Sequence, residues 1–130
     1  MIQSAAETID MKTAATLDRV HNAHSHRLDA KAIAPLFGVN LRTFATMIGA
    51  NANTVRTRSD SVTLQPALKD AVLTYDTLSE MFPLDETIAR WMHHPLRSLD
   101  NKRTPIELAE QEGIGALREL VESMFAGNYQ

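Results

Sequence analysis

Apolar residues recur at helical spacing along most of the chain, and short polar or glycine-containing turns interrupt them. Near the N-terminus, Ser4 and Glu7 have the spacing of a capping box, so we expect a first helix from Ala5 to about Asn22. No stretch alternates apolar and polar residues in the period-two pattern of a strand. The hydrophobic pattern therefore predicts an all-α fold.

A second helix is expected to begin at Asp29, whose carboxylate suits an N-cap, and to end near Phe37. Gly38 follows at the C′ position, where a left-handed residue without a Cβ is favoured. Pro35 lies inside this segment and has no backbone N–H to donate. We therefore expect it to kink or shorten the second helix.

Later capping signals divide the rest of the chain into further helices. Their expected bounds are Asn40 to Ile48, Asn51 to about Arg58, Thr63 to about Phe82, and Asp85 through Trp91. Thr104-Pro105-Ile106-Glu107 is a strong helix start, with Thr as N-cap, Pro at N1 and Glu reaching back from N3. Gly49 and Gly113 are expected to end helices, and Gly127 to close the last one.

Residues 41–60 have the spacing of a helix-turn-helix. Ala45 is in the fifth place, where the two helices approach closely, and Gly49 is in the ninth, where the sharp turn needs a positive φ. Val55 is in the fifteenth place and should pack the second helix on the first, while Phe44 and Ile48 complete the inner face. Arg58 occupies the eighteenth place, which is usually apolar, so we expect the second helix to be short there.

A recognition helix would present polar side chains to the major groove of DNA. We expect Arg56 to bind guanine and Asn53 to bind adenine, with Arg42 and Arg58 on phosphates. The full predicted DNA-binding set is Arg42, Asn51, Asn53, Thr54, Arg56, Thr57 and Arg58. The alternative is a helical hairpin with a solvated polar face.

Charge is distributed unevenly along the 130 residues, whose formal net charge is −3. Residues 28–62 hold four basic and two acidic side chains, whereas residues 63–130 hold six basic and eleven acidic ones. The middle is therefore the part suited to phosphate, with weak and salt-dependent affinity for a monomer. We divide the chain into an N-terminal helix and connector (1–27), a DNA-binding region (28–82) and a C-terminal domain (83–130).

Composition excludes several classes of protein. At 44% hydrophobic and 22% charged residues the chain is globular, and no apolar run reaches the roughly 18 residues that a membrane span needs. Without a signal-peptide pattern or any cysteine, a cytoplasmic protein without disulfides is expected. We find no enzymatic constellation, no cofactor motif and no metal site. His21, His24 and His26 have spacings compatible with metal ligation. We expect these imidazoles instead to contact solvent or the terminal carbonyl groups near a helix end.

The C-terminal segment carries a family resemblance. The residues that carry it are Ala89, Arg90, Trp91, Met92, Pro95, Leu99, Asp100, Asn101, Pro105, Ile106, Leu108, Gly113, Leu117, Met124 and Gly127. In this succession residues 84–130 resemble the toxin-binding domain of Xre/MbcA/ParS antitoxins, the partners of RES-domain toxins. The upstream helix-turn-helix is similar to the Xre-type domain that precedes it in that family.

Three positions depart from the family pattern. Asn101 stands where the family usually has Gly, and it is the non-Gly residue that best tolerates a left-handed conformation, so we expect the turn to survive. Glu110 and Leu117 stand where the family often has Thr and Val. Neither change threatens the fold, but both leave partner selectivity open.

The resemblance implies an all-helical antitoxin that dimerises, occludes the NAD-degrading active site of a RES toxin, and represses its own operon. The toxin-binding residues would be Trp91, Phe125, Ala126, Gly127, Asn128, Tyr129 and Gln130. Trp91 shares a helix with Ile88 and Met92 and is also suited to anchor the core. Two other interpretations keep the same motifs: a stand-alone regulator whose C-terminal module only dimerises, and an adaptor whose helix-turn-helix packs a dimer.

Overall fold

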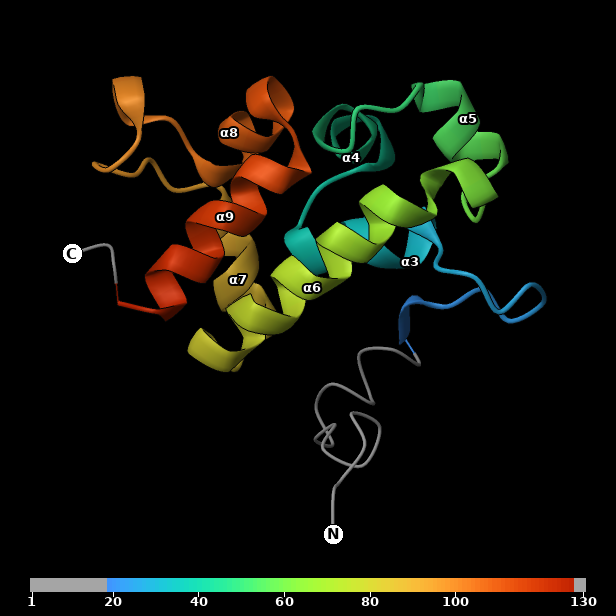
Figure 1. The fold of residues 1–130 in the computed structure, drawn as a ribbon, viewed down its shortest axis with the longest axis horizontal. Helices are drawn as coiled ribbons and strands as arrows, with labels where there is room; N and C mark the ends of the chain where they lie inside the picture. The colour runs from blue at the N-terminus through green and yellow to red at the C-terminus, as the bar shows by residue number, and fades with distance from the viewer. Residues whose placement is uncertain (1–18, 128–130) are drawn as a thin grey trace, which may run out of the picture.

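The structure is a computed structural model that describes residues 19–127, all of whose regular elements are helical (Figure 1). In chain order they are α3 (Ala30–Ile33), η1 (Ala34–Phe37), α4 (Leu41–Met47), α5 (Ala52–Thr57), η2 (Val62–Leu64), α6 (Gln65–Met81), α7 (Asp85–Met92), η3 (Asp100–Lys102), α8 (Pro105–Glu112) and α9 (Ile114–Phe125). An isolated β-bridge joins His21 to Leu28. The all-α prediction is confirmed. The capping box at Ser4 and Glu7 lies outside the described residues.

The second expected helix is divided into a short α-helix and a 3₁₀ turn, and the boundary lies just before Pro35. Asp29 is the N-cap of α3, and its carboxylate accepts a hydrogen bond from the backbone N–H of Lys31 at 2.9 Å. At Ala34 the α-helix gives way to the 3₁₀ turn η1, in which Pro35 lies near the start. Pro tolerates this place because the first turn needs no N–H from it. Gly38 ends the segment with φ 71°.

Side-chain caps fix most of the other helix starts. The Asn40 side chain accepts from Thr43 N at the start of α4, and the Asn51 side chain accepts from Asn53 N at the start of α5. Thr104 and Glu107 form a reciprocal capping box around the start of α8. Each cap satisfies backbone donors that have no partner within the helix. These starts were predicted correctly from local spacing.

The prediction for the start of the longest helix was wrong. Thr63 does not cap it. Ser61 caps the short turn η2 instead, and its hydroxyl accepts from Thr63 N, while α6 begins at Gln65 with Pro66 in its first turn. Pro at this position is pre-organised for a helix start, and the boundary lies one residue further toward the C-terminus than a Thr63 cap would place it.

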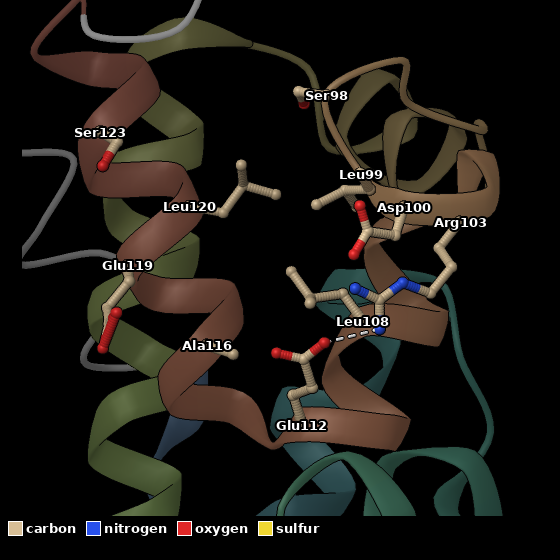
Figure 2. Close-up of a pocket in the computed structure, with 10 residues that line it drawn as sticks. All are labelled: Ser98, Leu99, Asp100, Arg103, Leu108, Glu112, Ala116, Glu119, Leu120 and Ser123. Carbon is tan, nitrogen blue, oxygen red and sulfur yellow. Dashed lines mark ion pairs between the residues drawn. The ribbon is translucent and has the colours of Figure 1, made fainter.

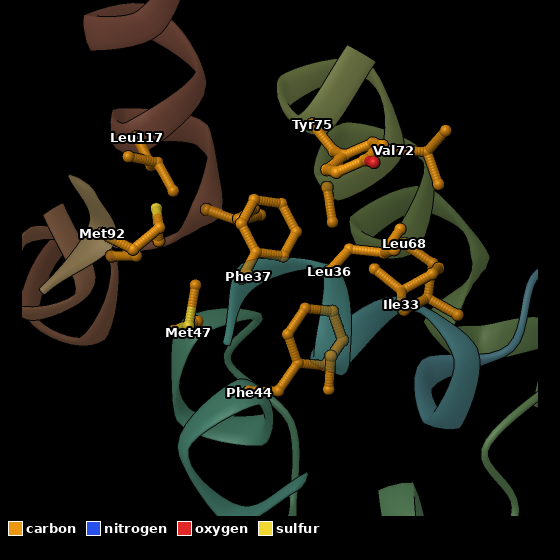
Figure 3. Packing of buried hydrophobic residues seen from close by; sticks show 14 of the residues in the cluster. Ile33, Leu36, Phe37, Phe44, Met47, Leu68, Val72, Tyr75, Met92 and Leu117 are labelled. Carbon is orange, nitrogen blue, oxygen red and sulfur yellow. The ribbon is translucent and has the colours of Figure 1, made fainter. Parts of the chain in front are cut away.

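One hydrophobic core draws side chains from both halves of the chain (Figure 3). Phe37 lies near its middle, stacked on Phe44 with ring centroids 6.3 Å apart and edge-on to Tyr75 of α6 at 6.2 Å. Met92 of α7 and Leu117 of α9 are fully buried in the same cluster. The regions 28–82 and 83–130 therefore share a core, whatever their separate roles.

Gly38 brings the η1–α4 junction into close contact with α7. A Cβ built on Gly38 would lie 2.7 Å from the Cβ of Ala89, closer than real Cβ atoms approach each other. The Nε2 of His93 donates to the carbonyl oxygen of Gly38 at 3.1 Å. Gly38 is thus needed both for its left-handed φ and for the space it leaves.

Arg19, which precedes α3 in the chain, forms polar contacts with residues of α6 and α7. Arg19 forms an ion pair with Asp85 at 2.8 Å, and the Tyr75 hydroxyl hydrogen-bonds the same carboxylate. Burial and the nearby Asp85 carboxylate raise the pKa of Tyr75 above its usual value, so the phenol stays a donor at neutral pH. Across the described part of the chain, no helix combines the length and apolar character needed to cross a membrane.

Candidate functional site

The helix-turn-helix spacing corresponds to two packed helices. Ala45 of α4 and Val55 of α5 are buried between them, as predicted, and Gly49 in the turn has φ 70°. A Cβ on Gly49 would meet nothing within 4 Å, so this glycine is required for its conformation and not for space. Ile48 is only partly buried, and Met47, which the spacing did not single out, fills the core instead.

The predicted DNA-binding residues lie on the outer surface of these two helices, but they are not equally free. Arg42, Asn51, Asn53 and Arg56 line one hollow of about 510 Å³. The side chain of Asn51 is committed to capping α5. Asn53 and Arg56 are bonded to each other, because the guanidinium of Arg56 donates to the Asn53 side-chain oxygen at 2.6 Å. This bond uses one of the five guanidinium N–H groups of Arg56 and one lone pair of the Asn53 oxygen, so it fixes the two side chains relative to each other.

The other three members of the set do not line the hollow. Thr54 is half-buried, and the Thr57 hydroxyl donates to the backbone carbonyl of Asn53 at 2.8 Å, so it faces its own helix. Arg58 follows the last residue of α5 and is exposed. The short second helix expected from an arginine in the eighteenth place is what the structure has.

A second hollow opens between the η3 segment, α8 and α9 (Figure 2). We call it the C-terminal groove, and its volume is about 350 Å³. Leu120 of α9 faces Leu99 and Leu108 across it (Figure 2). Its remaining lining residues are polar or small: Ser98, Asp100, Arg103, Glu112, Ala116, Glu119 and Ser123.

Arg103 forms part of one wall of the C-terminal groove, and only 15% of its side chain is exposed. Its guanidinium pairs with Glu112 at 2.7 Å and donates to the side-chain oxygen of Gln111 at 2.9 Å. Its Nε is buried and has no hydrogen-bond partner among the described residues. The sequence pattern did not identify Arg103, because its partners lie eight and nine residues away on a separate helix.

The turn before α8 confirms the expectation for Asn101. Asn101 has φ 60°, in the left-handed region where Gly is usual and Asn is tolerated. Lys102 follows with φ 54°, so the turn contains two consecutive left-handed residues. This conformation directs the chain from Leu99 back to Arg103 and shapes one wall of the C-terminal groove.

The predicted toxin-binding residues are divided between the core and the surface. Trp91 is partly buried and packs on Phe82, with ring centroids 6.0 Å apart. Phe125, at the end of α9, leaves 58% of its surface exposed, and Ala126 and Gly127 are exposed after it. Gly127 has φ 79°, as expected of a residue that closes a helix. Asn128, Tyr129 and Gln130 lie outside the described residues.

The imidazoles of the connector are not gathered into a metal site within residues 19–127, where no three histidine or carboxylate side chains are placed to hold an ion. His21 pairs through its backbone with Leu28. His26 adopts φ 61° in the turn.

Comparison with known proteins shows a likeness to a solved structure at the level of the fold. No protein-family model and no curated protein matches the chain. Among solved structures, the all-helical fold is similar to that of a chain in the crystal structure of the M. tuberculosis MbcT–MbcA toxin–antitoxin complex. The TM-score is 0.53 at 16% identity, over 94% of this chain and 100% of that chain. The resemblance predicted from sequence is therefore confirmed at the level of fold.

Proposed function

We propose that this chain is an antitoxin that neutralises a RES-domain, NAD-degrading toxin by covering its active site, and that it represses its own operon. The observation that carries the proposal is the full-length likeness to a chain of a toxin–antitoxin complex, which spans the helix-turn-helix and the C-terminal helices alike. The residue pattern of positions 84–130 supports the same assignment independently.

The exposed end of α9 supports occlusion as the mode of action. Phe125 presents a large apolar surface next to Gly127, whose left-handed φ is typical of a residue that ends a helix. An aromatic anchor followed by amide side chains suits insertion into a polar cleft. Such inhibition is stoichiometric and needs no catalytic group.

The proposal is tested by co-expression with a RES-domain toxin, taken from the neighbouring gene if that gene encodes one. The intact chain should keep cellular NAD and growth at the level of a toxin-free culture, and deletion of Gly127 to Gln130 should abolish this protection. If the intact chain gives no protection, the antitoxin assignment is wrong. If the deleted chain still protects fully, occlusion by the C-terminal end is wrong.

A matched pair of variants separates a specific anchor from general surface hydrophobicity. Phe125 and Val62 are both strongly exposed, at 58% and 67%, but Val62 lies in η2. Phe125→Ala should reduce protection and Val62→Ala should not. Equal effects of the two variants would contradict a role for Phe125 in binding the toxin.

Autorepression is proposed because α4 and α5 are two short consecutive helices with the residue spacing of a helix-turn-helix, and Arg42, Arg56 and Arg58 are exposed on or beside them. Arg56→Ala should weaken binding to the promoter DNA of the chain's own operon by about 1 to 3 kcal/mol in a gel-shift titration at fixed salt. Arg97→Ala removes another exposed positive charge, outside these helices, and is the control. Unchanged affinity of Arg56→Ala would exclude it from base recognition.

A homodimer would supply two half-sites about one helical turn of DNA apart, and it is part of the proposal. The alternative function is a stand-alone regulator that uses the C-terminal module for dimerisation. It is favoured if the chain binds its promoter as a dimer but neither copurifies with nor protects against the neighbouring gene product. Absence of any salt-dependent DNA binding would instead favour an adaptor.

A further inference from the structure

We infer that Asn53 and Arg56 form one recognition unit, in which Asn53 holds the guanidinium of Arg56 for a guanine and does not read adenine itself. The inference rests on the proposed DNA-binding function and goes further, because it assigns a base and gives the two side chains different roles. It follows from the hydrogen bond that joins them and from the charge of the hollow that they line.

The hollow at the starts of α4 and α5 is suited to a ligand that is rich in hydrogen-bond acceptors. Its lining residues are Leu41, Arg42, Asn51, Ala52, Asn53 and Arg56. None of these residues is acidic. Arg42 and Arg56 are exposed, and neither guanidinium forms an ion pair with any residue in the range 19–127. The hollow therefore offers two positive charges to phosphate oxygens or to the acceptor edge of a base.

The hydrogen bond between Asn53 and Arg56 sets the orientation of both side chains. The two residues are three apart on α5, so they are neighbours on one face of the helix. The terminal Nη2 of Arg56 donates to the Asn53 side-chain oxygen at 2.6 Å. Because arginine has donors and no acceptor, the amide oxygen of Asn53 must face the guanidinium and its NH₂ group must point away.

This bond leaves Arg56 able to bind a base through two donors. A guanidinium has five N–H donors in a planar fork, and Asn53 accepts from one of them. Whichever hydrogen of Nη2 is used, one pair of adjacent N–H donors remains, and Arg56 forms no other hydrogen bond within the described residues. Two such donors match the O6 and N7 acceptors of guanine in the major groove.

An asparagine at position 53 holds the guanidinium without neutralising it. A carboxylate there would form a stronger bond, but it would also bring a negative charge toward the phosphate backbone. Ordering a free arginine side chain on binding costs about two- to tenfold in affinity. Asn53 reduces this cost in advance, and the gain is realised only where a guanine is present. Asn53 is therefore a positioning residue for base recognition.

The experiment begins with selection from a library of random-sequence DNA duplexes by the full chain. We expect enrichment of sites that contain guanine. Each enriched guanine is then replaced in turn by 7-deazaguanine, which keeps Watson–Crick pairing but lacks the N7 acceptor. At the guanine that Arg56 contacts, this replacement should lower the affinity of the wild-type chain about tenfold, as expected for loss of a hydrogen bond to a charged group. We call the ratio of the two affinities the guanine discrimination.

Variants separate a positioning role from general support of the fold. Asn53→Ala should lower the guanine discrimination about two- to tenfold, whereas a purely structural role would weaken binding of both duplexes equally and leave the ratio unchanged. Asn53→Asp keeps an acceptor for Arg56, so it should retain the discrimination while phosphate repulsion lowers its affinity for both duplexes.

A double-mutant cycle tests whether Asn53 acts through Arg56. Arg56→Ala should abolish the guanine discrimination, and the addition of Asn53→Ala should change it no further. Thr46→Ala removes an exposed polar side chain of α4 outside the hollow and is the control, which should keep the wild-type discrimination.

Three results would overturn the inference while DNA binding stands. They are a selected site without a guanine that Arg56 contacts, an unchanged guanine discrimination in Asn53→Ala, and a selected adenine whose preference is lost in Asn53→Ala but kept in Arg56→Ala. The last would show that Asn53 reads adenine. If the wild-type chain selects no sequence at all, sequence-specific DNA binding is refuted and the inference with it, while protection against the toxin remains a separate measurement.

Discussion

Replacement of Gly38 by alanine should destabilise the whole bundle, because two independent costs act at this residue. The left-handed φ of 71° costs a residue with a Cβ about 1 to 2 kcal/mol. The new Cβ would also lie 2.7 Å from the Cβ of Ala89 and 3.3 Å from its Cα, and overpacking of this kind costs about 1 to 3 kcal/mol. The expected loss is therefore about 2 to 5 kcal/mol of unfolding free energy.

A double-mutant cycle separates the two costs. Ala89→Gly alone should cost about 1 kcal/mol, since it places a glycine within α7. In the double variant the steric contact with the Ala89 Cβ is absent, so the loss should be smaller than the sum of the single losses by about 1 to 2 kcal/mol. Urea denaturation followed by circular dichroism measures all four proteins.

Gly115→Ala is the matched control for this cycle. Gly115 lies in the first turn of α9 at a negative φ, and a Cβ there would meet nothing within 4 Å. Its replacement should be neutral or stabilise by up to about 1 kcal/mol. If the Gly38 and Ala89 losses add to within about 0.5 kcal/mol, the two residues are not in contact and the reasoning is refuted.

Three further predictions concern single side chains. Burial raises the pKa of Asp29, but hydrogen bonds from Ser59, Asn22 and the Lys31 backbone outweigh it and lower the pKa below its usual 3.8. The stability that the Asp29 carboxylate contributes is therefore complete at neutral pH and is lost as the pH falls through its lowered pKa. In urea titrations, Asp29→Asn should lower the unfolding free energy at pH 7 and approach the wild-type value below about pH 4. A difference between the two proteins that does not change with pH would contradict this. Thr104→Ala should cost about 0.5 to 2 kcal/mol by the same measurement, because it removes the N-cap of α8, and no loss would exclude capping as its role. Asn101→Gly should leave thermal stability equal or slightly higher, since Gly accepts the left-handed φ of 60° more readily, and a clear loss would mean that the Asn side chain contributes more than its backbone.

Features that depend on adjacent residues could be predicted from the sequence. The caps at Asp29, Asn40 and Asn51 are hydrogen bonds that span two or three residues, so the sequence spacing contains all the information they need. Glycines at the helix ends, such as Gly49, were found for the same reason. The wrong start of α6 shows the limit, since Thr63 has the character of a cap in the sequence, yet α6 begins at Gln65 without a side-chain cap and with Pro66 in its first turn.

The C-terminal groove and the contacts of the predicted DNA-binding residues could not be predicted in this way. The pairing of Arg103 with Glu112 and the approach of Leu99 to Leu120 depend on how η3, α8 and α9 pack, which no periodicity encodes. The Arg56–Asn53 bond joins residues three apart, but spacing cannot show whether each side chain points to its neighbour or to solvent. The sequence shows which face of a helix a residue lies on, but its contacts depend on tertiary packing and on the side-chain rotamer.

The single core shared by the two halves has a consequence for the lifetime of the protein in a cell. Phe44 of α4 and Leu117 of α9 belong to one buried cluster, so local unfolding of one half exposes the other. A partner that saturates the C-terminal half at about 100 times its dissociation constant would stabilise the entire chain, including α4 and α5, by about 2.7 kcal/mol. Proteases would then consume the free protein faster than the complex, and the amount of folded α4 and α5 would follow the amount of partner.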